Sequence, residues 1–152
     1  MIEVSIIHHI KGSPGFRRFG LGPRLYPCRG IDQLQKLFNN NSFWAKQRSK
    51  EDIKKMLKNS DVIITLWIKH KLIGFGRANT DTIYRATLWD IIVKKNLQNR
   101  GYGKLIVSTL LNSRELVNVE KIYLMSTKQE NFYQGCGFKI NKHQKLLFKE
   151  VD

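Results

Sequence analysis

The spacing of apolar residues along the chain predicts two helices followed by three strands. Apolar side chains recur every three or four positions over residues 31–39 and again over 49–58, which is typical of amphipathic helices. Ser49 lies three residues before Asp52, a spacing that resembles a capping box and predicts where the second helix begins. The run VIITLWIK at 62–69 is apolar at successive positions and rich in β-branched residues, so it predicts a strand buried on both faces. Strands at 72–79 and 83–93, joined to it by short turns, complete an antiparallel meander.

The second half of the chain alternates between helical and strand patterns. The elements expected there are a helix at 104–117, a short strand at 121–125, a helical turn at 130–135 and strands at 138–140 and 145–151. Two strands separated by one long helix require a parallel crossover. The sequence therefore predicts an α/β fold with one domain over residues 1–152, in which a mixed, mostly antiparallel sheet is flanked by helices.

The net charge is the strongest feature of the composition. Lys and Arg number 27 against 12 for Asp and Glu, which gives a formal charge of +15. This excess favours acidic partners such as nucleic acid, anionic lipid or a polyanionic small molecule. The heavy use of Lys, Ile and Asn is also what A/T-rich codons encode, so genome composition is a competing explanation. The charge by itself therefore selects no partner.

Several classes of protein are excluded by simple counts. A chain of 152 residues with 41% apolar residues is long enough and apolar enough for one domain with a core, and wholesale disorder is excluded. Its apolar stretches break well short of the ~18 residues that a membrane-spanning helix needs. Cys28 and Cys136 are too few for a disulfide scaffold or a structural zinc site, which favours a reducing compartment. His8 and His9 have no Cys, Asp or Glu at ligand spacing, so we expect a solvated strand end and no metal site.

The N-terminal thirty residues predict neither a targeting signal nor a regular element after the first strand. Residues 1–10 have an early acid and no basic region, so we expect no secretory or organelle leader and a protein that works where it is made. Residues 12–30 hold five glycines, three prolines and four arginines. Such a segment is expected to exclude a helix and to form a basic loop or a poorly ordered arm.

The segment QNRGYGK, from Gln98 to Lys104, carries the clearest chemical signal. It lies between a predicted buried strand and a predicted helix. Gly101 and Gly103 allow successive backbone N–H groups to converge on one point, and the start of the helix adds its dipole and unpaired donors. Arg100 adds formal positive charge. The segment therefore predicts an anion cradle suited to a phosphate or pyrophosphate.

Other motifs that this segment resembles fit less well. The Rossmann fingerprint requires a third glycine where this chain has Ile106, and the Walker A loop requires Ser or Thr where it has Leu105. The run RGYG at 100–103 begins like the RNA-recognition signature, but two of the three stacking aromatic residues that should follow are missing. That signature must also lie on a strand, whereas 104–117 is predicted to be helical. RNA binding through 100–103 is kept as the alternative function.

Two motifs together resemble the GNAT superfamily of N-acetyltransferases. The pattern D-x-x-V-x-x-x-x-Q-x-R-G-x-G-K, which runs from Asp90 through Val93 to Lys104, resembles the acetyl-CoA signature of that superfamily. The run NFYQGCGF at 131–138 resembles the F-Y-x-x-x-G-F segment that closes its fold. Further similarity, covering roughly residues 13–140, is to the cyanobacterial and plastid branch, which includes plastid-encoded forms of red algae.

This resemblance implies a cosubstrate, a reaction and a binding site. The cosubstrate is acetyl-CoA, and a primary amine (an arylalkylamine, a protein lysine or a protein N-terminus) attacks the thioester directly, with no metal. The strand that ends at Val93 is expected to splay from the strand at 121–125 and to hold pantetheine in the gap, while Gly103 leaves room for pyrophosphate. The residues implied to bind acetyl-CoA are Ile91, Ile92, Val93, Gln98, Asn99, Arg100, Gly101, Tyr102, Gly103 and Lys104. Many family members also have an Asn that contacts pantetheine; this chain has Ser126 there, so Ser126, Asn131 or neither makes that contact.

The same resemblance suggests catalytic roles that the residues themselves leave open. Tyr133 occupies the position of the general acid that protonates the leaving thiolate, and the alternative is a core aromatic. Asp90 is either a general base for the incoming amine or a structural acid paired with a lysine. Phe43 and Trp44 either line the acceptor side or pack in the core. Cys136 has no His placed to activate it and is expected to be buried packing.

The expected partners are therefore acetyl-CoA and an amine acceptor, with no nucleic acid. The oligomeric state is open between monomer and homodimer. The expected location is the plastid stroma or, failing that, a bacterial cytoplasm.

Overall fold

A computed structural model describes residues 2–152 and contains a five-stranded mixed sheet in the order β1-β2-β3-β4-β5. The first four strands are antiparallel neighbours, whereas β4 and β5 run parallel. The mixed, mostly antiparallel sheet with one parallel crossover is therefore confirmed. The strands are β1 (Val4–His9), β2 (Val62–Ile68), β3 (Lys71–Thr80), β4 (Arg85–Val93) and β5 (Lys121–Tyr123).

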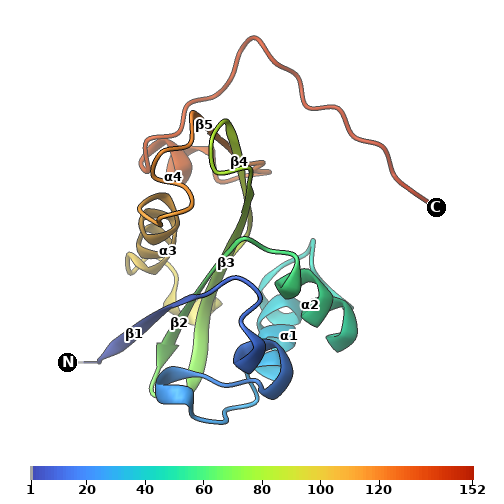
Figure 1. Cartoon of the computed structure of the whole chain (residues 1–152). Helices are drawn as coiled ribbons and strands as arrows, with labels where there is room; N and C mark the ends of the chain where they lie inside the picture. Colours follow the sequence, from blue (N-terminus) through green and yellow to red (C-terminus); the bar gives the residue numbers. More distant parts are fainter. Residues whose placement is uncertain (1) are drawn as a thin grey trace.

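Helices cover both faces of this sheet. Figure 1 views the sheet from its edge, with α1 and α2 on one side and α3 and α4 on the other. Three short helical turns lie in the connections. The helices are α1 (Gly30–Asn41), α2 (Lys50–Lys58), α3 (Tyr102–Leu111) and α4 (Glu130–Gln134), and the turns are η1 (Gly15–Phe19), η2 (Pro23–Leu25) and η3 (Lys95–Leu97).

The core forms two layers because successive residues of β2 point to opposite faces. Ile63 and Trp67 pack with α1 and α2, whereas Ile64 and Leu66 pack with α3. This is why the 62–69 run has no polar face in the sequence. The indole N–H of Trp67, which is fully buried, donates to Thr65 Oγ1 at 2.7 Å.

Local signals at helix ends are largely borne out. The Ser49 side chain accepts a hydrogen bond from the backbone N–H of Asp52 at 3.0 Å, as the predicted start of α2 requires. However, α3 ends at Leu111 and not at residue 117. Ser113 explains this difference, because its hydroxyl donates to the Leu110 carbonyl and its own carbonyl accepts from Leu116 in a non-helical turn.

The expectation for residues 12–30 is wrong in one respect. Residues 15–19 form a π-helical turn that ends at Gly20 in the left-handed conformation. Phe16 is buried and stacks on His9, with ring centroids 4.6 Å apart. One buried aromatic residue therefore anchors this basic segment to β1, so it is not a free arm.

His9 also differs from its expected place at a solvated strand end. Its side chain is buried, and Nε2 lies 2.7 Å from the hydroxyl of Thr65. Burial, together with the nearby His8, lowers the pKa of His9 to about 4. His9 is buried because the register of β1 on β2 points its ring towards Phe16, while His8 lies near Glu115.

The two C-terminal strands predicted at 138–140 and 145–151 are absent. Residues 139–152 are exposed and contain no strand, and Figure 1 shows this segment running away from the body after α4. A strand exists only when its backbone groups pair with a neighbour. The residue pattern there favours a strand, but no neighbouring edge lies beside it within residues 2–152.

Candidate active site

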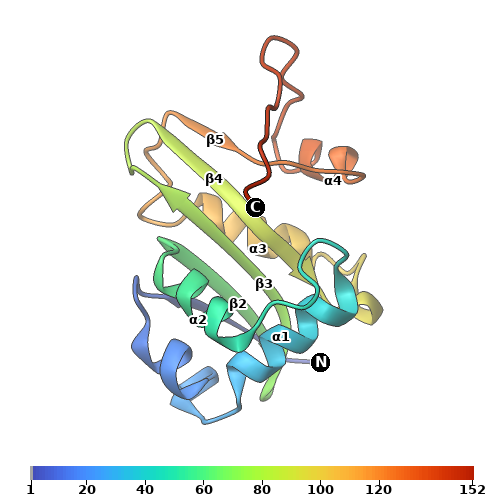
Figure 2. The same cartoon turned by 90° about the vertical axis from the view of Figure 1, so that its right-hand side faces the viewer.

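The sheet is open where β4 and β5 diverge. They pair only at Arg85–Lys121, Ala86–Ile122 and Thr87–Tyr123. The rest of β4, Leu88–Val93, has no partner on that side, and Figure 2 shows the two strands separating towards α4. The predicted splay is therefore present, and it leaves strand-type hydrogen-bonding groups of β4 without a neighbour.

A β-bulge lies in this unpaired part of β4. Phe75 pairs with Ile92 and Arg77 pairs with Trp89, so β4 has one more residue than β3 between those two pairs. Asp90 is in the bulge and has a left-handed φ of 53°. A bulge re-aims the residues around it, and here it changes the direction of β4 just before residues 91–93.

The Asp90 carboxylate is held by three donors. Its Oδ2 atom accepts from Arg77 Nε at 2.8 Å and from Arg48 Nη1 at 3.1 Å, and its Oδ1 atom accepts from Trp44 Nε1 at 3.3 Å. Burial by itself would raise the pKa of this carboxyl, but the hydrogen bonds and charges of the two guanidinium groups outweigh it and hold the pKa below its ordinary value. The partners of Asp90 are therefore arginines, and not a lysine as the sequence suggested.

Arg48 and Arg77 are the residues that sequence reasoning missed. Arg48 lies just before α2 and Arg77 lies on β3, so they meet Asp90 only in the folded sheet. Among 27 basic residues, no local signal marks these two as its partners.

The Gln98–Lys104 segment, predicted to be an anion cradle, forms the turn that leads from η3 into α3. Asn99 and Gly101 both have positive φ, 61° and 85°, and α3 begins directly afterwards at Tyr102. Within the part of the chain that the structure describes, the backbone N–H groups of residues 99–104 donate to no acceptor. Consecutive free N–H groups at the first turn of a ten-residue helix can bind an anion.

The side chain of Gln98 connects this cradle to the end of β4. Its side-chain amide donates to the Val93 carbonyl at 2.9 Å, so the end of the bulged strand and the start of the cradle are tied together. Gln98 therefore has a local partner of its own. The residues just before it on β4 differ in exposure: Ile91 is half-buried, whereas Ile92 and Val93 are buried.

The space beside Gly103 is occupied by protein. A Cβ atom at Gly103 would lie 3.1 Å from the ring of Phe132, which belongs to α4. By contrast, a Cβ at Gly101 would meet nothing within 4 Å. The absence of a side chain at Gly103 thus allows α4 to pack on the first turn of α3, which differs from the expectation that this position is open for pyrophosphate.

Tyr133 follows Phe132 and lies on the same short helix. Its ring contacts Phe132 and Phe138 edge-on, with centroids 4.9 and 6.1 Å away. Burial, with a smaller contribution from Cys136, raises the pKa of Tyr133 to about 12. The phenol therefore keeps its proton at neutral pH. Cys136 is only half-buried, so it is less enclosed than expected.

The other residues predicted around the site lie at its margins. Ser126 accepts the N–H of Gln129 at 2.9 Å in the turn before α4, and Asn131 is exposed on α4. Phe43 and Trp44 are exposed and pack against each other, with centroids 5.2 Å apart. Core packing of this aromatic pair is therefore excluded, and the bond from Trp44 to Asp90 places the pair beside the bulge.

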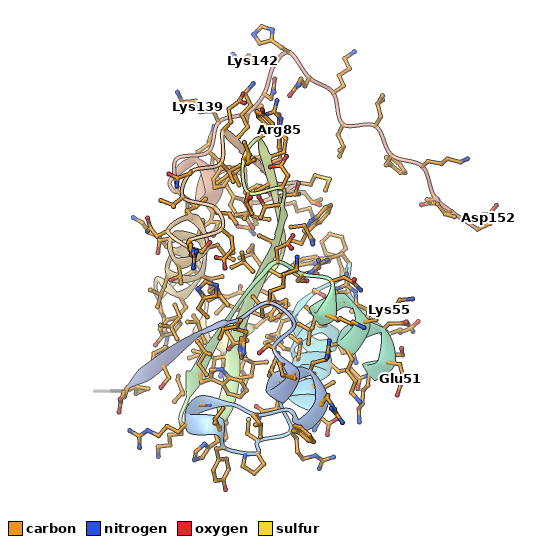
Figure 3. All side chains as sticks on the ribbon, in the orientation of Figure 1. Glu51, Lys55, Arg85, Lys139, Lys142 and Asp152 are labelled. Carbon is orange, nitrogen blue, oxygen red and sulfur yellow. The ribbon has the colours of Figure 1, made fainter. Side chains whose placement is uncertain are left out.

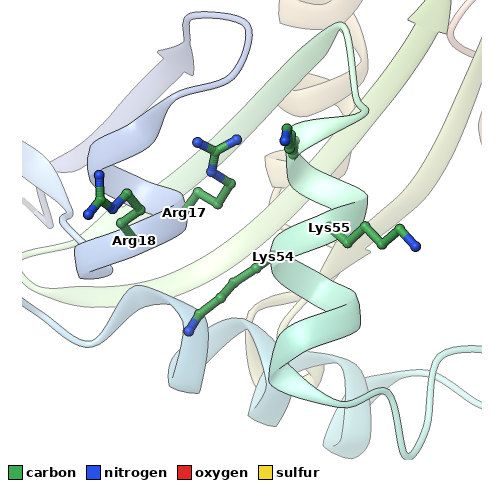
Figure 4. A pocket seen from close by; sticks show the side chains of 5 residues that line it. Arg17, Arg18, Lys54 and Lys55 are labelled. Atoms are coloured by element: carbon green, nitrogen blue, oxygen red, sulfur yellow. The ribbon is translucent and has the colours of Figure 1, made fainter.

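Two open depressions on the surface lie away from this site. One, of about 440 Å³, is lined by Arg17 and Arg18 from η1 and by Lys54, Lys55 and Lys58 from α2, as Figure 4 shows. A second, of about 240 Å³, lies beside Cys28 and the start of α1. Neither is lined by residues of the splayed strands or the cradle.

Residues 2–152 contain neither a membrane-spanning helix nor a cluster of possible metal ligands. No helix there is both long enough and apolar enough to cross a membrane. No three His, Cys, Asp or Glu side chains there gather into a possible metal site.

The amino-acid sequence matches one family of known proteins. Residues 59–140 match the acetyltransferase (GNAT) domain. The uncharacterized N-acetyltransferase ycf52 of Pyropia yezoensis is 34% identical over 100 residues, which are 62% of this chain and 57% of that protein. GCN5-related N-acetyltransferase 1, chloroplastic, of Arabidopsis thaliana is 27% identical over 113 residues, 71% of this chain and 55% of that protein. The chain thus spans less than two thirds of the length of these relatives.

Solved structures show the same fold at low identity. A probable acetyltransferase of Staphylococcus aureus superposes with a TM-score of 0.74 at 19% identity, covering 98% of this chain and 100% of that one. A putative GNAT-family acetyltransferase of Xanthomonas campestris gives a TM-score of 0.72 at 18% identity, covering 99% and 95%. The single GNAT-fold domain with helices on both faces of a five-stranded sheet is therefore shown.

Proposed function

The chain belongs to the acetyltransferase (GNAT) domain family, and from this premise we propose that it transfers the acetyl group of acetyl-CoA to a primary amine by direct attack. The observation that carries the proposal is the run of free backbone N–H groups at 99–104, placed directly after a strand whose outer edge is unpaired. A pyrophosphate and an extended amide-bearing arm are the two parts of acetyl-CoA that such groups would satisfy.

The residues present fit acetyl-CoA. The N–H groups of Asn99 to Lys104 would hold the pyrophosphate, and the exposed side chains of Arg100 and Lys104 would add charge. Residues 91–93 would hold pantetheine as an added strand, with the Val93 N–H directed at the thioester oxygen, where negative charge develops. Ser126 and Asn131 are the remaining candidates for contact with pantetheine. The bound cosubstrate supplies the acetyl group as a thioester.

The reaction needs a proton donor for the leaving thiolate and a proton acceptor for the amine. Tyr133 is proposed to protonate the leaving thiolate, which its raised pKa supports because the phenol is a proton donor at neutral pH. Asp90 was the candidate base, but its two arginine partners and lowered pKa make it a weak proton acceptor. We therefore assign Asp90 to fixing the bulge, with water accepting the proton of the amine.

The site and the relatives support proposals for the acceptor and the location. Phe43 and Trp44 offer an exposed aromatic surface next to Asp90, which suits the stem of an amine-bearing side chain or ring. Arylalkylamines, protein lysines and protein N-termini are the three classes to assay. Because one relative is named chloroplastic, we propose that the protein acts in a plastid, in the stroma.

Calorimetric titration with acetyl-CoA tests the binding step, with an RNA oligomer titrated in parallel. We expect saturable one-to-one binding of acetyl-CoA and, with a suitable amine, release of free CoA thiol. Arg100→Ala should weaken binding only modestly, because backbone donors make most of the proposed contact. Lys36→Ala, on the exposed side of α1, is the matched control for loss of one positive charge. RNA binding that survives moderate salt, without any response to acetyl-CoA, would favour the alternative function.

A further inference from the structure

A small loop at residues 21–27, here called the tip loop, is fixed at its base and exposed at its outer end. The Gly22 N–H donates to the Tyr26 carbonyl at 2.9 Å, so the loop closes on itself. A Cβ atom at Gly22 would lie 3.2 Å from the ring of the fully buried Trp67, so the base of the loop packs on the core. The outer residues meet water instead, since Leu25 is 76% exposed and Tyr26 is 50% exposed. The tip loop therefore holds an exposed leucine in a fixed place.

The backbone of the tip loop is strained at the residues that it exposes. Arg24 and Leu25 both have left-handed φ angles, of 55° and 58°. L-residues other than asparagine and aspartate rarely adopt this conformation, because the Cβ atom crowds the following carbonyl. Strain of this kind is concentrated at functional sites. Here its result is that the apolar side chain of Leu25 lies in water, although neither residue contributes to the core.

Positive side chains lie beside the tip loop. The ring of Tyr26 stacks on the ring of His70 with centroids 4.0 Å apart, which places the loop next to the turn between β2 and β3. Lys69 and Lys71, on either side of His70, are exposed. Figures 1 and 2 both show this turn and residues 15–29 at the same end of the molecule, opposite β5 and α4. The exposed leucine is thus displayed within a basic surface.

The helical turn η1 continues this basic surface. Arg17 and Arg18 line the depression of about 440 Å³ together with three lysines of α2, and no acidic residue lines it. Phe19, the last residue of η1, is 64% exposed, and the guanidinium carbon of Arg18 lies 5.3 Å from the centroid of its ring. No ion pair within residues 2–152 includes Arg17, Arg18, Arg24, Lys69 or Lys71. The tip loop, η1 and residues 69–71, here called the basic end, therefore combine positive charge with exposed apolar groups.

We propose that the basic end docks on an anionic lipid surface, with Leu25 entering the headgroup region and the surrounding cations contacting lipid phosphates. This contact goes beyond acetyl transfer and uses none of the residues assigned to that reaction. Attachment to a membrane surface requires burial of apolar side chains together with attraction to negatively charged lipids. The basic end provides both, and the tip loop, which is already fixed, loses little conformational freedom on binding.

The arrangement of the side chains favours a lipid surface over a small anion or a nucleic acid. Figure 4 shows the arginines of η1 and the side chains of Lys54 and Lys55 pointing in different directions. A single phosphate would not contact all of them, whereas an array of headgroups would. Single-stranded nucleic acids bind by stacking their bases on aromatic rings. Leu25 has no ring, and one face of Tyr26 is covered by His70, so the tip loop offers little to a base.

Sedimentation of the full-length chain with vesicles tests the proposal. Vesicles of phosphatidylglycerol mixed with phosphatidylcholine should carry the protein down, whereas vesicles of phosphatidylcholine alone should leave it in solution. Leu25→Asn should weaken binding to the anionic vesicles by about tenfold or more, because the burial of a leucine side chain is lost. Its unfolding free energy should hold or rise, since asparagine adopts the left-handed conformation more readily than leucine. Leu147→Asn, at an exposed site after α4, is the matched control and should bind as the wild type does.

A second pair of variants tests the charges. Arg24→Gln with Lys71→Gln should weaken binding by about 25-fold, at about fivefold for each cation near an anionic surface. Lys139→Gln with Lys142→Gln removes the same charge at the opposite end of the molecule, where Figure 3 labels both residues. Binding by this control should be unchanged, because charges further from the membrane than about 10 Å are screened.

Several results of these sedimentation experiments would overturn the proposal. They are no binding to anionic vesicles, equal binding to neutral vesicles, and wild-type binding by Leu25→Asn. A control pair that loses as much affinity as the test pair would also overturn it. An RNA oligomer that binds the wild type and Leu25→Asn equally, while vesicles bind neither, would assign the basic end to nucleic acid instead.

A polarity-sensitive dye shows which end of the molecule faces the lipid. The dye is attached to Leu25→Cys or to Leu147→Cys in full-length chains that also carry Cys28→Ser and Cys136→Ser. The serine hydroxyl at position 28 can replace the thiol, which donates to the Gly20 carbonyl at 3.4 Å. With anionic vesicles, the emission of the dye at residue 25 should shift to shorter wavelength, and the emission at residue 147 should not. No shift at residue 25, or an equal or larger shift at residue 147, would overturn the proposed orientation and with it the docking surface.

Discussion

The two ends of the sheet differ in how completely their backbone is paired. At one end, β2 lies between β1 and β3 along its whole length, and helices cover both faces. At the other end, β4 loses its neighbour after three residue pairs, β5 pairs on one side only within residues 2–152, and residues 139–152 are exposed and form no strand. Unpaired backbone groups are costly to bury, so they persist only where water or a ligand can reach them.

This contrast indicates that the two ends of the sheet have different roles. The closed end, made of β1 to β3 with α1 and α2, should determine stability. The open end, made of the second half of β4 with β5, the cradle and α4, should determine binding and catalysis. Substitutions at the closed end should therefore change stability, and substitutions at the open end should change binding or kcat. A substitution that changes both to a similar extent would contradict this division.

The largest effect is expected at Tyr133, in the open end. Tyr133→Phe keeps the ring and its contacts with Phe132 and Phe138 and removes only the hydroxyl. If that hydroxyl protonates the thiolate, kcat should fall by roughly 10²- to 10⁴-fold, while acetyl-CoA affinity and the melting temperature barely change. Steady-state kinetics with an amine that the wild type acetylates measures this. An unchanged kcat, under conditions in which chemistry limits the rate, would leave water as the proton source.

The next effect is expected at Trp67, in the closed end. Trp67→Ala removes a fully buried indole and its bond to Thr65, and should lower the free energy of unfolding by about 3–5 kcal/mol. Trp44→Ala is the matched control, because Trp44 is exposed, and should change stability by less than about 1 kcal/mol. Urea denaturation of both variants tests the contrast. Similar losses of unfolding free energy in the two variants would mean that the open end contributes as much to stability as the closed end.

The same contrast explains what could be predicted from the sequence. The strands β2 to β4 were predicted well because their patterns of apolar residues are strong and their neighbours follow directly in the chain. The strands predicted at 138–140 and 145–151 were wrong although their residues suit a strand. Strand formation depends on a partner edge, and the sequence does not say where that edge is.

The candidate site was predictable only where local geometry defines it. Gly101 indicated the strand-to-helix turn, because glycine readily adopts the left-handed conformation that this turn requires. The bulge at Asp90 and its bonds to Arg48 and Arg77 were not predictable, because Arg48 lies 42 residues away in sequence and Arg77 meets Asp90 only through the register of β3 on β4. For the same reason, the contact of Gly103 with Phe132 became visible only in the structure.

A third prediction concerns the pH dependence of the closed end. Burial lowers the pKa of His9 to about 4 in the folded chain, against the ordinary value of 6.5 for histidine. The unfolded state therefore binds more protons between these two pH values, so stability is full above pH 6.5 and is lost as the pH falls towards 4. A pKa shift of this size lowers the free energy of unfolding by about 3 kcal/mol at pH 4 and below, relative to neutral pH.

His9→Gln provides the control for this pH dependence. Glutamine can still bond to Thr65 but does not titrate in this range, so the variant's unfolding free energy should vary less between pH 7 and pH 4. Urea unfolding of both proteins at several pH values gives the difference. If the two profiles are parallel, other groups carry the acid sensitivity and His9 does not protonate on unfolding.

The smallest effects are expected at the two cradle glycines, which separate backbone strain from packing. Gly101→Ala places a side chain at a φ of 85° but in open space, so it should cost about 1 kcal/mol of stability through strain alone.

Gly103→Ala adds no such strain, since its φ is not positive, and alanine favours the helix that begins there. Its Cβ would instead meet the Phe132 ring at 3.1 Å and push α4, and with it Tyr133, outwards by a few tenths of an ångström. Stability should therefore hold in Gly103→Ala while kcat falls several-fold. Unfolding and kinetic measurements on the two variants together decide this: a loss of stability without a loss of kcat at Gly103 would mean that α4 is fixed by contacts other than this one.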